Sequence, residues 1–218
     1  MSPEKRAVAV FWSHKRFWLL QTLAIAGWMA LALAWFWLPD SRVWGVVLSA
    51  LLGVVVIVGG LWLIGAALLF YQKPGPIWRE SLRRVPALLV WGAVFALAIW
   101  ASQRLKAPAW IWIIPAVLLL PLAAQVTAEG IRGLFRMVWR ARYFPTAVVL
   151  IIAGAYLPYV LIGWRPQLSG LAMQTASLAV RFAVAYLVAV SAWLVLASLI
   201  ARLGENPAPS HARSSSAP

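Results

Sequence analysis

Long apolar stretches, separated by short segments with charged or turn-forming residues, run through almost the whole chain. Six of them are predicted to be transmembrane helices, at residues 17–38, 43–71, 85–102, 109–126, 143–164 and 176–201. Each is near or above the ~20 residues that a helix needs to cross the hydrocarbon core of a bilayer. The alternating pattern of a membrane barrel is absent. The sequence therefore predicts an all-α polytopic membrane bundle, with six transmembrane helices in three hairpins.

Composition strengthens the membrane interpretation. Hydrophobic residues make up 64% of the 218 positions and charged residues 11%, whereas soluble domains contain roughly half and a quarter. The net charge of +14 also suits a nucleic-acid binder, but such a protein does not need repeated apolar runs of membrane-spanning length. We therefore expect membrane lipids as partners, anionic on the cytoplasmic side, and no nucleic acid.

Basic residues are distributed unequally between the two sets of loops. If the N-terminus is cytoplasmic, the inner segments hold fourteen of the 19 Lys and Arg residues and the outer segments hold five. The positive-inside rule then predicts that both termini are cytoplasmic. We expect a bacterial inner membrane, because the chain is compact and lacks sorting motifs. Residues 1–203 form the transmembrane domain in this interpretation, and the Pro- and Ser-rich residues 204–218 are expected to be a disordered cytoplasmic tail.

A weak internal similarity accompanies this topology. The segment "FWLLQTLAIAG" from Phe17 matches "FPTAVVLIIAG" from Phe144 without a gap, and each follows a basic segment that contains a tryptophan. A threefold repeat of one hairpin unit and shared membrane composition both explain the match. The arrangement resembles, in topology alone, bacterial six-helix membrane domains such as those attached to some glycerophosphodiester phosphodiesterases, and this resemblance implies no activity here.

Two basic segments are predicted to be short amphipathic helices on the cytoplasmic face. In "GIRGLFRMVWRARYFPT", from Gly130, the arginines fall on one side of a helical wheel and apolar residues on another, and "PIWRESLRRV", from Pro76, has the same design. Each cation near an anionic surface contributes about 1 kcal/mol. These residues either contact lipid headgroups or a partner, or only fix the topology. The candidate contacts are Arg79, Arg83, Arg84, Arg132, Arg136, Arg140, Trp78 and Trp139.

Small residues recur along the second predicted helix, at Ser49, Gly53, Gly60 and Ala67. Their spacing of four and seven keeps them on one side, where they would let another helix approach closely. A helix of the same chain and a second copy of the chain are both candidate partners for this side. We expect Gly60→Leu to destabilise the protein or its oligomer.

Prolines and deep tryptophans are the features that a transport site would use. Pro115 and Pro121 in the fourth predicted helix and Pro158 in the fifth are expected to kink their helices, and broken helices line binding sites in some transporters. The residues around the fourth-helix prolines are almost all apolar, so these prolines either mark a site or, more simply, kink packed helices. Four tryptophans are predicted to lie deep in the bilayer, where they line an apolar cleft or simply fill the core: Trp28, Trp62, Trp91 and Trp193.

Catalytic chemistry is nearly missing from the sequence. The chain has no cysteine, its histidines are His14 and His211, and it contains neither a Walker loop nor a GxSxG motif. We therefore predict no enzyme activity, no cofactor and no metal site. The expected function is that of a scaffold or accessory subunit, which acts through its basic cytoplasmic face or as a homo-oligomer. The alternative is a transporter or permease for an apolar or lipid-like solute, which a side cleft open to lipid would favour.

Overall fold

The computed structural model describes residues 13–38, 43–72, 75–105, 113–135, 141, 143–166 and 169–204. All regular structure in these ranges is helical, and the long helices are α2 (Lys15–Phe36), α3 (Val43–Gln72), α4 (Ile77–Arg104), α5 (Ile113–Glu129), α6 (Tyr143–Gly163) and α7 (Leu171–Ala201). Two short 3-10 helices, η2 (Gly130–Phe135) and η3 (Arg202–Gly204), follow α5 and α7. Six segments in this part of the chain are long and apolar enough to cross a membrane, with η2 extending the α5 segment. The prediction of an all-helical, multi-pass membrane protein is thus confirmed.

The largest difference from the predicted boundaries is at α4. The basic segment at residues 77–84 is continuous with the helix that follows, so α4 is one helix of 28 residues and not a surface helix joined to a shorter span. Pro86 lies inside it. A proline removes one backbone donor but does not prevent the helix from continuing on either side. The arginines of this segment therefore stand on the first turns of a membrane-spanning helix.

The second predicted amphipathic helix, at residues 130–142, also differs where it is described. Its first six residues form η2, and Gly130 has a φ of 72°, in the left-handed region that favours glycine. This turn brings η2 back against α5, where a Cβ on Gly133 would collide with the backbone of Gln125. Residues 136–140 and 142 lie outside the described residues, as does the predicted tail from residue 205.

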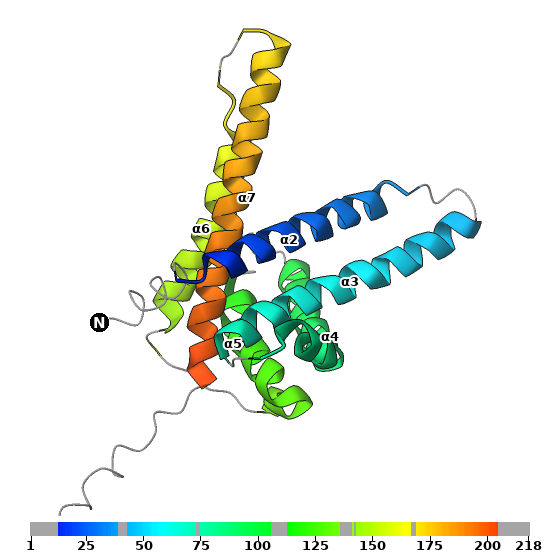
Figure 1. Ribbon diagram of the computed structural model, residues 1–218, viewed down its shortest axis with the longest axis vertical. Coiled ribbons are helices and arrows are strands. Elements are labelled where there is room, and N and C mark those ends of the chain that lie inside the picture. The colour runs from blue at the N-terminus through cyan, green and yellow to red at the C-terminus, as the bar shows by residue number, and fades with distance from the viewer. Residues whose placement is uncertain are drawn as a thin grey trace, which may run out of the picture.

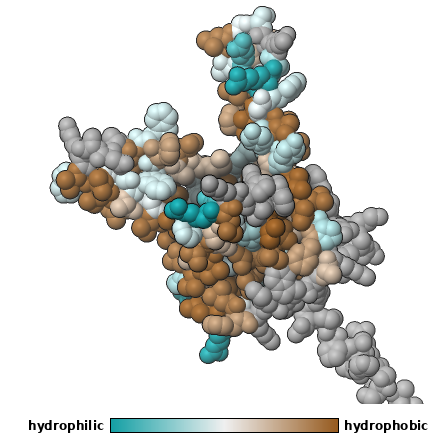
Figure 2. Space-filling model, turned by 180° about the vertical axis from the view of Figure 1, so that it is seen from behind, coloured by the Kyte–Doolittle hydropathy of each residue, from teal (hydrophilic) through white to brown (hydrophobic). Residues whose placement is uncertain are grey.

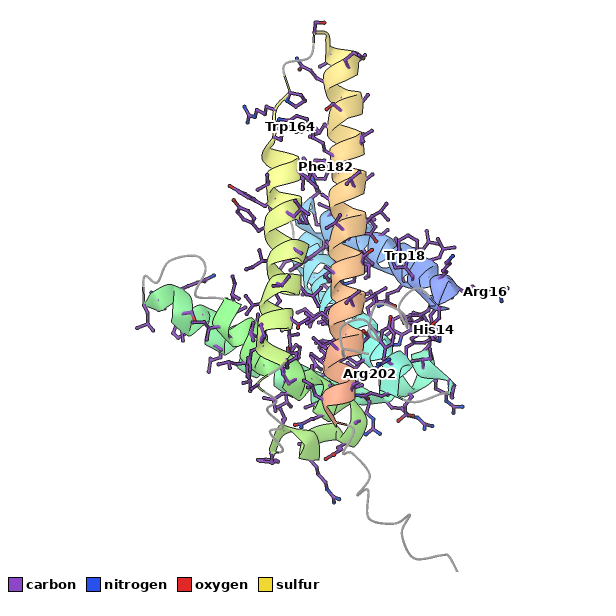
Figure 3. The ribbon with its side chains drawn as sticks, turned by 90° about the vertical axis from the view of Figure 1, so that its left-hand side faces the viewer. His14, Arg16, Trp18, Trp164, Phe182 and Arg202 are labelled. Atoms are coloured by element: carbon purple, nitrogen blue, oxygen red, sulfur yellow. The ribbon has the colours of Figure 1, made fainter. Side chains whose placement is uncertain are left out.

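The helices form pairs that come together at one end and diverge at the other (Figure 1). In the ribbon of Figure 1, α2 and α3 extend together to one side and α6 and α7 extend together in another direction. The third pair, α4 and α5, overlaps the meeting region in that view, and Figure 3 shows that it also extends away from α6 and α7, to the left. We call this meeting region the base; it contains the first residues of α2, α4 and α6 and the last residues of α3, α5 and α7. The charge count assigns these same six ends to one side of the membrane. Figure 3 shows Arg202 at the base end of α7 and Trp164 near the opposite end of the α6–α7 pair.

The core is concentrated at the base. Leu68, Leu88 and Leu194 are fully buried there, and the rings of Phe17 and Phe70 are stacked, with centroids 3.7 Å apart. The α5 segment is the most buried of the six, with 61% of its apolar window inside the protein, compared with 11% for α6. Apolar side chains dominate the face seen in Figure 2, as expected of a surface that meets lipid tails.

Glycines mark two close approaches between helices. A Cβ added to Gly65 of α3 would lie 2.5 Å from Ser81 Oγ of α4, and one added to Gly154 of α6 would lie 3.1 Å from Ala192 Cβ of α7. Van der Waals contact of this kind is a main source of helix association in lipid. Gly27 is the counterpart of Gly154 in the proposed repeat. A Cβ added to Gly27 would have no atom within 4 Å, so the two matched glycines have different environments.

Candidate functional site

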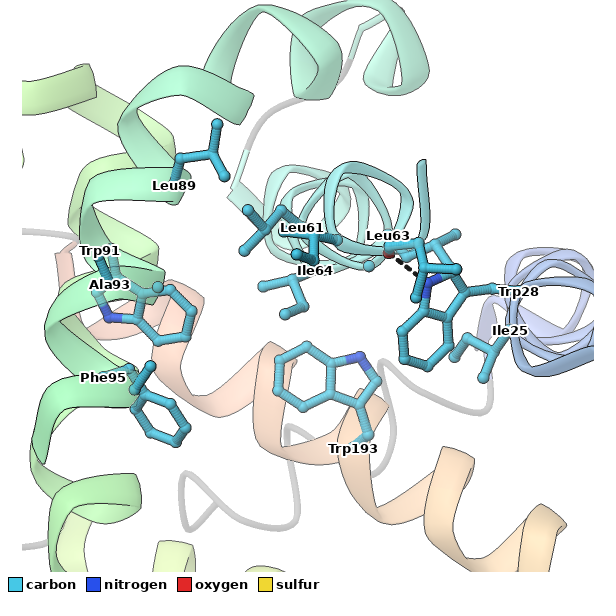
Figure 4. A pocket seen from close by; sticks show the side chains of 15 residues that line it. Ile25, Trp28, Leu61, Leu63, Ile64, Leu89, Trp91, Ala93, Phe95 and Trp193 are labelled. Atoms are coloured by element: carbon cyan, nitrogen blue, oxygen red, sulfur yellow. Dashed lines mark hydrogen bonds between the residues drawn. The ribbon is translucent and has the colours of Figure 1, made fainter. Parts of the chain in front are cut away.

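An apolar cavity of about 750 Å³ lies between α2, α3, α4 and α7 (Figure 4). It is partly open to the surface, and its volume is in the range of small-molecule binding sites. Its walls come from three consecutive helices, α2, α3 and α4, and from α7, which is distant from them in sequence. The lining residues are Ile25, Trp28, Val56, Ile57, Gly60, Leu61, Leu63, Ile64, Leu89, Trp91, Gly92, Ala93, Phe95, Ala96 and Trp193.

The wall formed by α2 and α3 depends on Trp28. Its indole Nε1 donates a hydrogen bond of 2.7 Å to the carbonyl oxygen of Val56. The ring lies directly on Gly60, since an added Cβ there would be 3.1 Å from Trp28 Cζ2. Any larger residue at position 60 would displace the ring, so the packing of Trp28 requires glycine at this position.

The wall formed by α4 is aromatic as well. The ring of Trp91 is almost fully buried, and its Nε1 donates a hydrogen bond of 2.9 Å to the carbonyl oxygen of Leu119 in α5. The ring of Phe95, one turn further along α4, is stacked with that of Trp91 at a centroid distance of 5.4 Å. The hydrogen bond to α5 fixes the orientation of this wall.

Trp193 enters the cavity from α7 (Figure 4). Among the described residues, nothing accepts a hydrogen bond from its Nε1. Its N–H is therefore a polar group exposed in a cavity that is otherwise apolar.

A smaller apolar cavity, of about 360 Å³, lies between α2, α6 and α7. Pro158 lines it, together with Met29, Phe182 and Tyr186. The phenol of Tyr186 donates its proton to the carbonyl oxygen of Thr22, which joins α7 to α2. The polar groups on this side are therefore used for helix packing.

The predicted small-residue side of α3 packs against side chains of α2. Ser49 Oγ accepts a hydrogen bond of 3.1 Å from Trp35 Nε1, and an added Cβ on Gly53 would lie 3.1 Å from the same ring. Gly60 receives Trp28, and Ala67 is fully buried at the base. Three of these small residues, Ser49, Gly53 and Gly60, therefore accommodate tryptophan rings of the same chain.

The predicted prolines occupy three different positions. Pro115 is in the first turn of α5, where backbone N–H groups have no intrahelical acceptor. Pro121 is buried inside α5, and Pro158 is inside α6. Both helices continue through these residues.

Of the eight predicted lipid-contact residues, four lie in the first turns of α4 and one lies on η2. Glu80 Oε1 lies 3.2 Å from Arg84, and Glu80 Oε2 lies 3.7 Å from Arg83. Trp78 is partly buried, and its carbonyl oxygen accepts a hydrogen bond of 2.8 Å from Trp62 Nε1. Arg79 is exposed on the first turn of α4, and Arg132 is exposed on η2. Arg136, Trp139 and Arg140 lie outside the described residues.

Gly130, at the start of η2, lies close to Arg84 of α4. A Cβ on Gly130 would lie 3.2 Å from a guanidinium nitrogen of Arg84, so the turn between α5 and η2 rests against α4. Arg84 is consequently less exposed than Arg83, with side-chain exposures of 30% and 63%. Of the two, Arg83 is the better placed to reach a lipid headgroup.

The sequence indicated three of the aromatic residues that form the larger cavity but not the cavity itself. Trp28, Trp91 and Trp193 were identified by their depth, whereas Phe95 and Gly92 carry no pattern of their own. Which helices surround a cavity depends on how the helix pairs diverge. No periodicity within a single helix contains that information.

No protein-family model matches this chain, and no curated protein or solved structure shows significant similarity to it.

Proposed function

We propose that this protein is an integral membrane protein that binds an apolar, lipid-like molecule in the larger cavity, as a carrier or permease for that class of solute. The observation that supports the proposal is the cavity itself, which is large, partly open to the surface and lined by apolar residues of four helices. The hydrocarbon chains of lipids are the most abundant groups in a bilayer that match the apolar lining of this cavity. A packed scaffold would have no need of such a space.

We further propose the topology that the charge count predicts. The helices form three hairpins, both termini are in the cytoplasm, and the base faces the cytoplasm in a bacterial inner membrane. The grouping of six helix ends at the base supports this arrangement, because the same ends hold Arg79, Arg83, Arg84 and Arg202.

Occupancy of the cavity is tested by native mass spectrometry of the full-length protein, extracted in a mild detergent. We expect lipid to remain bound to the wild type. Gly92→Leu adds a side chain at the cavity wall, where the new Cβ would be 3.5 Å from Leu61, and should reduce the bound lipid strongly. Gly27→Leu is the matched control, because that glycine is helical and has no atom within 4 Å.

Two results would contradict the binding proposal. One is a wild-type protein that retains no lipid under conditions in which it stays folded. The other is equal retention by the Gly92→Leu and Gly27→Leu variants. Carriage, as distinct from binding, requires lipid or solute flux in reconstituted liposomes above that of liposomes without protein.

A scaffold or accessory subunit is the second candidate, and the low burial of α6 supports it, because only 11% of its apolar window lies inside the protein and the remaining apolar surface is available to a partner helix. In this function the basic face at the base binds anionic lipid or a partner protein. Replacement of Arg132, Arg136 and Arg140 with Gln should then weaken anionic-lipid binding, at about 1 kcal/mol for each lost charge, without altering the melting temperature. Unchanged retention of anionic lipid would show that these arginines only set the orientation of the protein in the membrane.

A further inference from the structure

The two apolar cavities have a common wall. Ile25 of α2 and Trp193 of α7 line both of them, while the other lining residues differ. The cavities are unequal, at about 750 and about 360 Å³. A molecule that filled both would need two apolar branches that join beside Ile25 and Trp193.

Trp193 differs from the other deep tryptophans in its hydrogen bonding. Trp28, Trp62 and Trp91 donate to the carbonyl oxygens of Val56, Trp78 and Leu119, over 2.7, 2.8 and 2.9 Å. A buried indole N–H normally has a partner, and lipid supplies no water to replace one. Trp193 is the exception among the four within the described residues.

The other side-chain donors that line the cavities are already used. Trp28 and Trp91 donate to backbone carbonyls, and Tyr186 donates to Thr22. Neither cavity is lined by a charged residue in the part of the chain that the structure describes. One N–H group, on the common wall, is therefore available to an oxygen atom of a bound molecule.

We propose that the molecule bound here is a diacyl lipid, with one hydrocarbon chain in each cavity and an ester carbonyl oxygen that accepts a hydrogen bond from Trp193 Nε1. This inference rests on the proposed function, and it adds the class of ligand. Ester carbonyls are the acceptors nearest to the point where the two chains of such a lipid join. The charged headgroup lies outside the cavities, whose linings offer it no counter-ion.

The test compares two phospholipids with the same headgroup and chains, one with ester linkages and one with ether linkages. The ether lipid lacks both carbonyl oxygens but fills the same space. Delipidated full-length protein is titrated with each lipid in detergent, and the bound fraction is measured by native mass spectrometry. We expect the wild type to bind the diester about fivefold more tightly, the factor that corresponds to a net hydrogen bond of about 1 kcal/mol.

Trp193→Phe removes the N–H but retains an aromatic ring, and should bind both lipids with the affinity that the wild type shows for the diether. Trp62→Phe is the matched control, because Trp62 also donates to a backbone carbonyl and does not line either cavity. It should keep the fivefold preference. If Trp193→Phe does not fold, the comparison of the two lipids on the wild type still decides the role of the carbonyl.

The two-chain requirement is tested with the single-chain lysophospholipid and with Ala189→Phe, which fills the smaller cavity. Wild type should prefer the two-chain lipid, and Ala189→Phe should lose that preference. Equal affinity for diester and diether, or a preference that survives Trp193→Phe, would overturn the carbonyl contact. Equal affinity of the wild type for one-chain and two-chain lipids would overturn the two-cavity arrangement. Either result leaves the proposed function standing. That function fails if the wild type retains no lipid, or if the Gly92→Leu and Gly27→Leu variants retain it equally.

Discussion

Replacing Gly65 with alanine should break the close contact between α3 and α4 at the base. The added Cβ would lie 2.5 Å from Ser81 Oγ and 3.0 Å from Leu88 Cδ1. Leu88 ends in a flexible side chain and can shift slightly. Ser81 cannot shift without cost, because it is fully buried and its Oγ donates a hydrogen bond of 2.6 Å to the carbonyl oxygen of Trp62. The substitution therefore either separates α3 from α4 or breaks this hydrogen bond.

The expected cost follows from these two effects and one opposing effect. Overpacking of a close contact costs about 1–3 kcal/mol, and a lost interhelical hydrogen bond in a membrane protein costs about 0.6–1.7 kcal/mol. Alanine is a better helix former than glycine by about 0.5–1 kcal/mol. We expect Gly65→Ala to lower the free energy of unfolding by about 1–3 kcal/mol. Gly27→Ala, with no atom within 4 Å, should raise it by about 0.5–1 kcal/mol.

The measurement is unfolding of both variants and the wild type in the same detergent, by heat and by denaturant. A second variant identifies the cause. Ser81→Ala removes the closest atom and leaves Ser81 Cβ at 3.6 Å from the new carbon, so the double variant should be more stable than the sum of the single changes predicts. The reasoning is refuted if Gly65→Ala and Gly27→Ala change stability in the same direction and by the same amount.

Three further substitutions test other contacts. Gly60→Leu should displace the Trp28 ring from its position against α3 and lower the free energy of unfolding by about 1–3 kcal/mol. An unchanged melting temperature and an unchanged oligomeric state in detergent would contradict this packing. Arg181→Gln should cost about 1 kcal/mol, because the guanidinium donates a hydrogen bond of 3.1 Å to the carbonyl oxygen of Ile162 at the end of α6, whereas exposed Arg165→Gln should have almost no effect; equal melting curves would count against this cap. Glu80→Gln should change stability by less than about 1 kcal/mol but increase anionic-lipid retention, as measured by mass spectrometry of copurified lipid; lower retention would contradict the role given to the neighbouring arginines.

The number and position of the helices were accessible from sequence because they depend on local composition. A run of about twenty apolar residues must satisfy its backbone internally wherever it lies in the membrane. The start of α4 was predicted differently because charged residues at positions 79–84 suggested a surface helix. Charged residues do not interrupt a helix, so α4 extends back through them to its N-cap at Pro76.

The candidate site was less accessible, since it depends on contacts between helices. The seven-residue spacing drew attention to Gly53 and Gly60, and both receive tryptophan rings of α2. Gly65 belongs to no such spacing, although it makes the closest approach to α4. A pattern within one helix identifies a side with small residues, but not the partner that will occupy it. The missing hydrogen-bond acceptor of Trp193 likewise becomes visible only when the surrounding helices are in place.

The length of α4 has a consequence for the membrane in which this protein is stable. At 1.5 Å per residue, its 28 residues measure roughly 42 Å, whereas the apolar part between Arg84 and Arg104 measures roughly 29 Å, close to the thickness of a typical hydrocarbon core. The distance between the charged residues at the two ends of this apolar part therefore matches one thickness of the hydrocarbon core. A thicker membrane would draw one end into hydrocarbon or compel the lipid around α4 to thin, and a thinner one would tilt the helix.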